Sequence, residues 1–150
     1  MYLSGLREAG IPGYIYLFAH ARSDRLQGAI HMTQITDVIR RSGFWHGQPI
    51  LVDACNAGAS TDGVASILAF TLGTYVTAPT TTTWNYALGG PAVGQGAFEK
   101  LPGLLSRLSL PHLLRPGHWR TWGPDGQPLA ITRTSPRDGG RPVGRAEGRN

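Results

Sequence analysis

The sequence of 150 residues predicts an α/β fold with a mainly parallel sheet. Three short apolar runs, at residues 14–19, 50–52 and 75–78, are typical of buried strands. The segments between them carry apolar residues at helical spacing. A β-α-β-α-β order implies parallel strands joined by right-handed crossovers. A chain of this length is one domain, large enough to bury a core.

Each element of this pattern has its own signals. The run Tyr14–Ala19 predicts a strand buried on both faces, which ends at His20. The first helix is predicted to begin behind Thr33 as its N-cap and to end at Gly43. The second strand, Ile50–Val52, runs into Asp53-Ala54-Cys55.

The second helix is predicted to start at an N-cap among Ser60, Thr61 and Asp62 and to end at Gly73. The third strand, 75–78, follows. Beyond Thr80 the pattern predicts a loop over Gly89–Gly96 and an interrupted helical stretch over Leu101–Leu114. A hairpin then joins Trp119–Trp122 to Pro128–Ile131, with both tryptophans packing across strands.

The formal net charge of +5 is concentrated in the last 18 residues. Five arginines and two acids give residues 133–150 a charge of +3, which leaves +2 for the rest. The tail is rich in glycine and poor in apolar residues, so we expect a folded domain over 1–132 and a disordered basic tail over 133–150. A nucleic-acid partner would depend on this tail alone, and we do not expect one.

The single cysteine excludes an internal disulfide framework and a zinc site with several thiolates. A zinc site from His20, His31, His46 and Cys55 would need four loops to converge, so we expect neither a metal nor an organic cofactor. No run of 18 apolar residues and no signal-peptide pattern is present, so we expect no membrane-spanning helix.

Two reactive side chains follow neighbouring predicted strands. His20 comes after the first strand and Cys55 after the second, and sites in parallel sheets form outside the carboxyl ends of strands. A thiolate beside an imidazole suits nucleophilic catalysis. The alternative, a small buried Cys55 with a packing role only, stays open at this point.

The run Asp53-Ala54-Cys55-Asn56-Ala57-Gly58, behind a strand that ends in His20, resembles the nucleophile motif of caspase-like (clan CD) cysteine peptidases. The segments 75–80 and 117–126 are similar to the peptidase-like modules of bacterial polymorphic toxins. The resemblance covers roughly residues 12–131. It implies a caspase-like three-layer sandwich with a small C-terminal hairpin.

The resemblance also implies roles for single residues. Cys55 would be the nucleophile and His20 its proton partner, with backbone N–H groups of Cys55 and Ala21 as the oxyanion hole. Ala21 departs from the glycine that is usual there. Asp53 matches an acidic position that binds a basic substrate residue in some members, and it can equally be a structural acid.

The predicted function is a cysteine endopeptidase with a Cys-His dyad, cleaving after a basic residue, as a toxin or effector module. Thr80 and Trp84 follow the third strand and are expected to line the substrate pocket. The expected partners are a protein or peptide substrate and an immunity protein, and delivery within a larger secreted bacterial protein would fit. The alternative is a binding module that keeps the fold without the activity.

Overall fold

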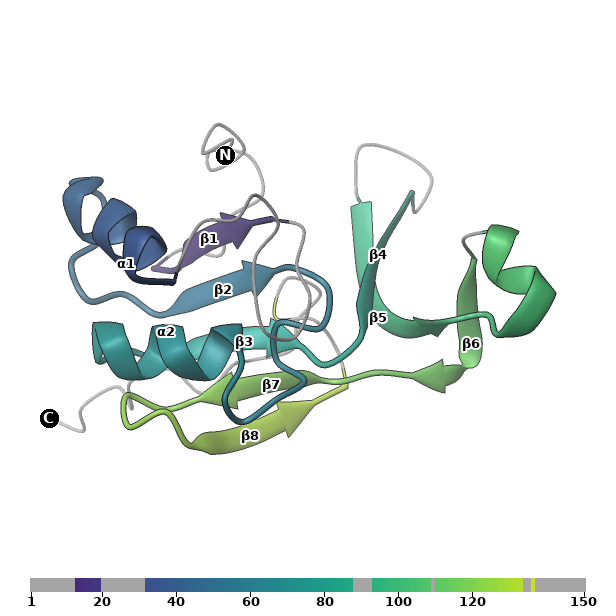
Figure 1. Cartoon of the computed structure of the whole chain (residues 1–150). Helices are drawn as coiled ribbons and strands as arrows, with labels where there is room; N and C mark the ends of the chain where they lie inside the picture. Colours follow the sequence, from purple (N-terminus) through teal and green to yellow (C-terminus); the bar gives the residue numbers. More distant parts are fainter. Residues whose placement is uncertain (1–12, 20–31, 88–92, 109, 134–135, 137–150) are drawn as a thin grey trace, which may run out of the picture.

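The structure, a computed structural model of the whole chain, describes residues 13–19, 32–87, 93–108, 110–133 and 136. They form a five-stranded sheet, a three-stranded sheet and helices (Figure 1). In chain order the elements are β1 (Ile15–Phe18), α1 (Met32–Arg41), β2 (Ile50–Asp53), α2 (Val64–Leu72), β3 (Val76–Pro79), β4 (Thr82–Ala87), β5 (Val93–Lys100), the 3-10 helix η2 (Gly103–Leu108), β6 (Pro111–Pro116), β7 (Trp119–Trp122) and β8 (Pro128–Thr132).

The central sheet has the order β1-β2-β3-β7-β8. Its first three strands are parallel, with Ile15 opposite Ile50 and Ile50 opposite Val76. β7 runs antiparallel to β3, and β8 antiparallel to β7. The predicted α/β class, the β-α-β-α-β order and the C-terminal hairpin are confirmed. The sheet is mixed rather than mainly parallel, because the hairpin β7-β8 joins it and adds two antiparallel pairings to the two parallel ones.

The helices α1 and α2 lie side by side on one face of the central sheet (Figure 1). Alternate strand residues such as Val52 and Ala78 are fully buried against them, together with Trp122. The opposite face carries Leu51 and Trp119, which pack in a second cluster with Ala97 of β5. The two predicted packing tryptophans therefore face opposite sides of the sheet, and both are buried.

The three-stranded sheet, of order β4-β5-β6, extends from the carboxyl-edge side of β3 (Figure 1). Together with η2 it forms the part of the chain that we call the arm, residues 82–116. The chain enters and leaves the arm at one place, where the Thr80 N–H donates to the His118 carbonyl at 2.8 Å. The His118 N–H in turn donates to Thr80 Oγ1 at 3.0 Å.

Several sequence predictions were wrong in detail. β1 is not buried on both faces, because it is the edge strand of its sheet and Phe18 is 52% exposed. Residues 93–96 belong to β5 rather than to a loop, and 88–92 lie outside the described residues. The stretch 101–114 divides into η2 and the first part of β6, because Pro111 has no N–H to continue a helix.

The helix ends also differ from prediction. Thr33 is not an N-cap, since α1 begins at Met32. The N-cap of α2 is Gly63, and no side chain bonds to the helix start. The Ser60 hydroxyl instead donates to the Asp62 carboxylate, so neither residue caps. Gly73 does end α2, at φ +64°, as predicted. None of the helices in the described ranges is long and apolar enough to cross a membrane.

Candidate active site at the carboxyl edge of the sheet

Cys55 lies in a tight turn that directly follows β2, and it is partly exposed. The turn begins at Ala54, which is buried against the helices, and its hydrogen bonds start with the Ala57 N–H donating to the Ala54 carbonyl at 3.1 Å. This position is the carboxyl edge of the parallel strands, where α/β proteins carry their sites. The alternative interpretation, in which Cys55 is fully buried and only packs in the core, is therefore wrong.

The residue after the cysteine adopts a backbone conformation that side chains rarely take. Asn56 has φ +60°, the one described non-glycine residue with a positive φ. Asparagine tolerates this region better than most residues. The reversal lets the Asn56 N–H donate to the Thr81 carbonyl at 2.9 Å. The turn therefore points the chain back toward the segment that leaves β3.

A second bond fixes the turn to β3. The Gly58 N–H donates to the Pro79 carbonyl at 2.9 Å, and a Cβ at position 58 would lie 2.5 Å from the Ala78 carbonyl oxygen. Only glycine permits this approach of two backbones. On its other side the turn accepts a bond from α2, where the Ala65 N–H donates to the Ala57 carbonyl at 3.1 Å. The cysteine turn is thus joined to β3 and to α2.

In the described chain, the Cys55 sulfur has a hydroxyl partner that comes from the arm. Cys55 Sγ lies 3.7 Å from Thr83 Oγ1, within hydrogen-bond distance for sulfur. Thr83 is fixed at the start of β4, where it pairs with Ala97 of β5. The sequence analysis did not select Thr83. Its position within a run of four threonines gives no sign of which hydroxyl reaches the sulfur.

His20 and Ala21, the predicted proton partner and oxyanion residue, lie outside the described residues. The residue before His20 is described. The Ala19 N–H donates to the Asp53 carbonyl at 3.3 Å, so β1 ends beside the last residue of β2. β1 therefore ends at the same sheet edge that carries Cys55.

Asp53, the predicted substrate acid, is 2% exposed at the last position of β2. It lies opposite Phe18 of β1, on the face of the sheet away from the helices. A buried carboxylate needs polar partners. The structural role and the substrate role that the sequence left open both remain compatible with this position.

Thr80 and Trp84 lie before and after Thr83 and have bonds of their own. The Thr80 hydroxyl is engaged by the backbone of His118, at 3.1 Å to its carbonyl. The Trp84 indole N–H donates to the Phe98 carbonyl at 3.1 Å, so its ring is held against β5. Both residues are partly buried. Of the three residues, Thr83 is the one whose hydroxyl lies within hydrogen-bond distance of the sulfur.

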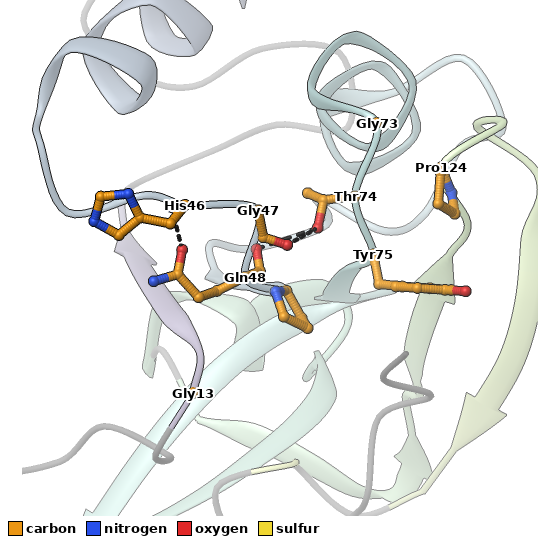
Figure 2. Close-up of a pocket in the computed structure, with 9 residues that line it drawn as sticks. Gly13, His46, Gly47, Gln48, Gly73, Thr74, Tyr75 and Pro124 are labelled. Carbon is orange, nitrogen blue, oxygen red and sulfur yellow. Dashed lines mark hydrogen bonds between the residues drawn. The ribbon is translucent and has the colours of Figure 1, made fainter. Parts of the chain in front are cut away.

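The opposite edge of the sheet carries a pocket of about 530 Å³ (Figure 2). Its lining comes from the residues that precede the parallel strands, among them Gly13, Pro49 and Tyr75. His46 also lines it, so this histidine lies at the edge away from Cys55. The Thr74 hydroxyl is held at 3.2 Å from the carbonyls of Gly47 and Gln48. The pocket and the cysteine turn are separate features of the fold.

In the described part of the chain, no three His, Cys, Asp or Glu side chains gather closely enough to hold a metal ion.

Comparison with known proteins gave one family. No curated protein and no solved structure matched the chain. A family described as "Domain of unknown function (DUF8616)" matches residues 6–95. The match spans the three parallel strands, the cysteine turn and position 20, which is more than half of the chain. The chain belongs to this family of domains of unknown function.

Proposed function

We propose that the chain is a cysteine endopeptidase of the caspase-like type, with Cys55 as nucleophile and His20 as its proton partner. The observation that carries the proposal is the bond from the Ala19 N–H to the Asp53 carbonyl, 3.3 Å long. It places Ala19, the residue before His20 in the sequence, beside Asp53, two residues before Cys55. A partly exposed thiol at the carboxyl edge of parallel strands supports the same role.

The proposed reaction has two steps. The imidazole of His20 accepts the thiol proton, and the Cys55 sulfur attacks the peptide carbonyl to form a C–S bond. The C–N bond then breaks, and the leaving amine takes the proton from His20. Water afterwards hydrolyses the thioester, which releases the acid and restores the thiol.

The hydrogen bonds of the cysteine turn narrow the choice of oxyanion donors. The amides of Asn56, Ala57, Gly58 and Ala59 all donate to backbone carbonyls. None of these four can turn toward a developing oxyanion unless its own bond breaks. This supports the proposal that the amides of Cys55 and Ala21 hold the oxyanion.

The proposed substrate is a polypeptide that lies along the segment 80–84. Thr80 and Trp84 would border its side chains, because both flank the residue in contact with Cys55. Asp53 would favour a basic residue before the cleaved bond. The finer fold assignment, a caspase-like three-layer sandwich, and the role of a toxin or effector module with an immunity partner belong to the same proposal.

The test is covalent labelling with a peptidyl acyloxymethyl ketone that carries arginine at its reactive end, read by intact mass. We expect one adduct on the wild type, none on Cys55→Ala, and strongly reduced labelling on His20→Ala. His46→Ala is the matched control, because His46 lies at the other edge of the sheet, and it should label as the wild type does.

Hydrolysis of fluorogenic peptides with arginine, aspartate or leucine at the cleavage position then reports specificity. We expect the arginine peptide to be cleaved fastest and this preference to weaken in Asp53→Asn. Equal labelling of wild type and His20→Ala would contradict the dyad. Labelling without hydrolysis of any peptide would favour the binding module instead.

A further inference from the structure

The arm carries an unusual concentration of exposed leucines. We call them the leucine surface: Leu104, Leu105, Leu108, Leu110, Leu113 and Leu114. Their exposed fractions run from 49% to 88%. Scattered single leucines are normal on protein surfaces, whereas six within eleven residues form a patch.

These leucines lie together at the end of the arm. The Leu101 N–H donates to the Leu110 carbonyl at 3.2 Å, which closes the chain around η2 and sets it beside the start of β6 (Figure 1). Leu113 and Leu114 are neighbours in β6, and both are largely exposed.

β6 is also an outer strand. In the order β4-β5-β6, no further strand of the described chain pairs with its free edge. An exposed apolar edge strand is a template for pairing with another strand. Natural proteins protect such edges with prolines, charges or bulges. β6 has a proline at each end, and its pairing with β5 is irregular between Phe98 and Lys100, so it offers a partner its leucine side chains rather than a regular backbone edge.

The area of the leucine surface is close to what a dimer needs. Six leucines with these exposures present on the order of 700 Å² of mostly apolar area, against about 800 Å² buried by each partner in a standard interface. The largest apolar patch on a typical monomer is roughly 300–600 Å².

The charged side chains on and beside this surface are few. Arg115 is paired with Glu99, with Nη1 and Oε2 3.3 Å apart. Arg107 on η2 and Lys100 at the end of β5 are exposed cations. A surface made mostly of leucine side chains is complementary to itself, as a two-fold interface requires. We propose that the leucine surface binds the leucine surface of a second copy of this chain.

The test is sedimentation velocity of the full chain between roughly 1 and 100 µM, a range that brackets micromolar dissociation constants. We expect the wild type to shift from monomer to dimer with concentration. Leu113→Asp and Leu108→Asp should each raise the dissociation constant at least tenfold. Far-UV circular dichroism and thermal melting show whether each variant is folded. If an aspartate variant does not fold, Leu113→Ser replaces it in the same measurement.

Leu129→Asp is the matched control, because Leu129 is a comparably exposed leucine on β8, outside the arm. It should dimerise as the wild type does. A wild type that is monomeric at every concentration overturns the proposal. Co-sedimentation of that monomer with phosphatidylglycerol vesicles would assign the surface to lipid instead. Loss of the dimer in Leu129→Asp alone would overturn it as well.

Discussion

The sulfur of Cys55 lies 3.7 Å from the hydroxyl oxygen of Thr83, which joins the turn after β2 to the first strand of the arm. A hydroxyl is both a donor and an acceptor, so it can serve the thiol or the thiolate. The contact therefore gives the sulfur a polar partner from the arm and holds it beside β4.

Replacing Thr83 by valine should slow the alkylation of Cys55 by iodoacetamide at pH 7 by about threefold to tenfold, a loss on the order of one charge-assisted hydrogen bond. Thr83→Ser keeps the hydroxyl and should keep the rate. Equal alkylation rates for Thr83→Val and the wild type would count against the hydrogen bond, and so would a rate for Thr83→Ser as low as that of Thr83→Val.

The left-handed backbone at position 56 gives a second prediction. Asn56→Gly should retain or slightly increase stability, because glycine adopts φ +60° without strain. Asn56→Val should cost about 1–3 kcal/mol, since a β-branched residue is disfavoured in this region. Urea denaturation measures both variants. Equal stability of the two would show that the turn relaxes to another conformation.

Gly58 gives a third, steric prediction. The Cβ of Gly58→Ala would lie 2.5 Å from the Ala78 carbonyl oxygen, so one of the two backbones must move. We expect a loss of about 1–3 kcal/mol in the free energy of unfolding, as in other overpacked sites. Iodoacetamide alkylation of Cys55 should change with it, because the turn would shift. Thr61→Ala, at an exposed position in the same loop, is the control and should stay near wild type.

A buried hydroxyl pair couples β3 to β7. Thr77 Oγ1 and Thr121 Oγ1 are 2.9 Å apart, and both residues are almost fully buried. Thr77→Val leaves the hydroxyl of Thr121 without this partner and should cost about 1–3 kcal/mol. The double variant Thr77→Val/Thr121→Val should be more stable than the sum of the single losses predicts. Strict additivity in this double-mutant cycle would show that the bond contributes nothing.

The pH dependence of stability should include a contribution from Tyr14. Partial burial raises the pKa of this phenol, because it disfavours the charged form. The unfolded chain then loses the proton at a lower pH than the folded chain does. The contribution is fully present below the ordinary pKa near 10 and is lost as pH rises through the folded value. Tyr14→Phe should flatten the alkaline end of the stability profile in urea titrations; an unchanged profile would contradict this.

The parts of the fold that could be predicted are those in which local pattern and tertiary environment agree. The runs at 50–52 and 75–78 are apolar and became central strands, buried on both faces. Gly73 was predicted as a helix end because the left-handed C-cap favours glycine, and α2 ends there.

Prediction failed where neighbours far away in the sequence decide. The apolar run 14–19 gives no sign that its strand lies at a sheet edge, so the exposure of Phe18 was missed. The glycines in residues 93–96 favoured a loop in the sequence analysis, because glycine is depleted in strands. Pairing with β4 and β6 nevertheless makes this segment part of a strand. Cys55 could be selected because it is the only cysteine. The contact between Cys55 and Thr83 could not be predicted, because the two residues are 28 positions apart in the sequence. The register of β4 on β5 decides which threonine reaches the sulfur.

The junction of Thr80 with His118 has a consequence for how much the arm can vary. The chain leaves and rejoins the central sheet at the hydrogen-bonded residues Thr80 and His118. The arm between them is therefore an insertion between β3 and β7. Closing a longer or shorter loop at a fixed junction changes the chain entropy only slowly with length. A chain whose arm is replaced beyond β4 and β5 should therefore preserve the strand order and the cysteine turn. We therefore expect the sequence of the arm to vary among related proteins while the sheet that positions Cys55 is kept.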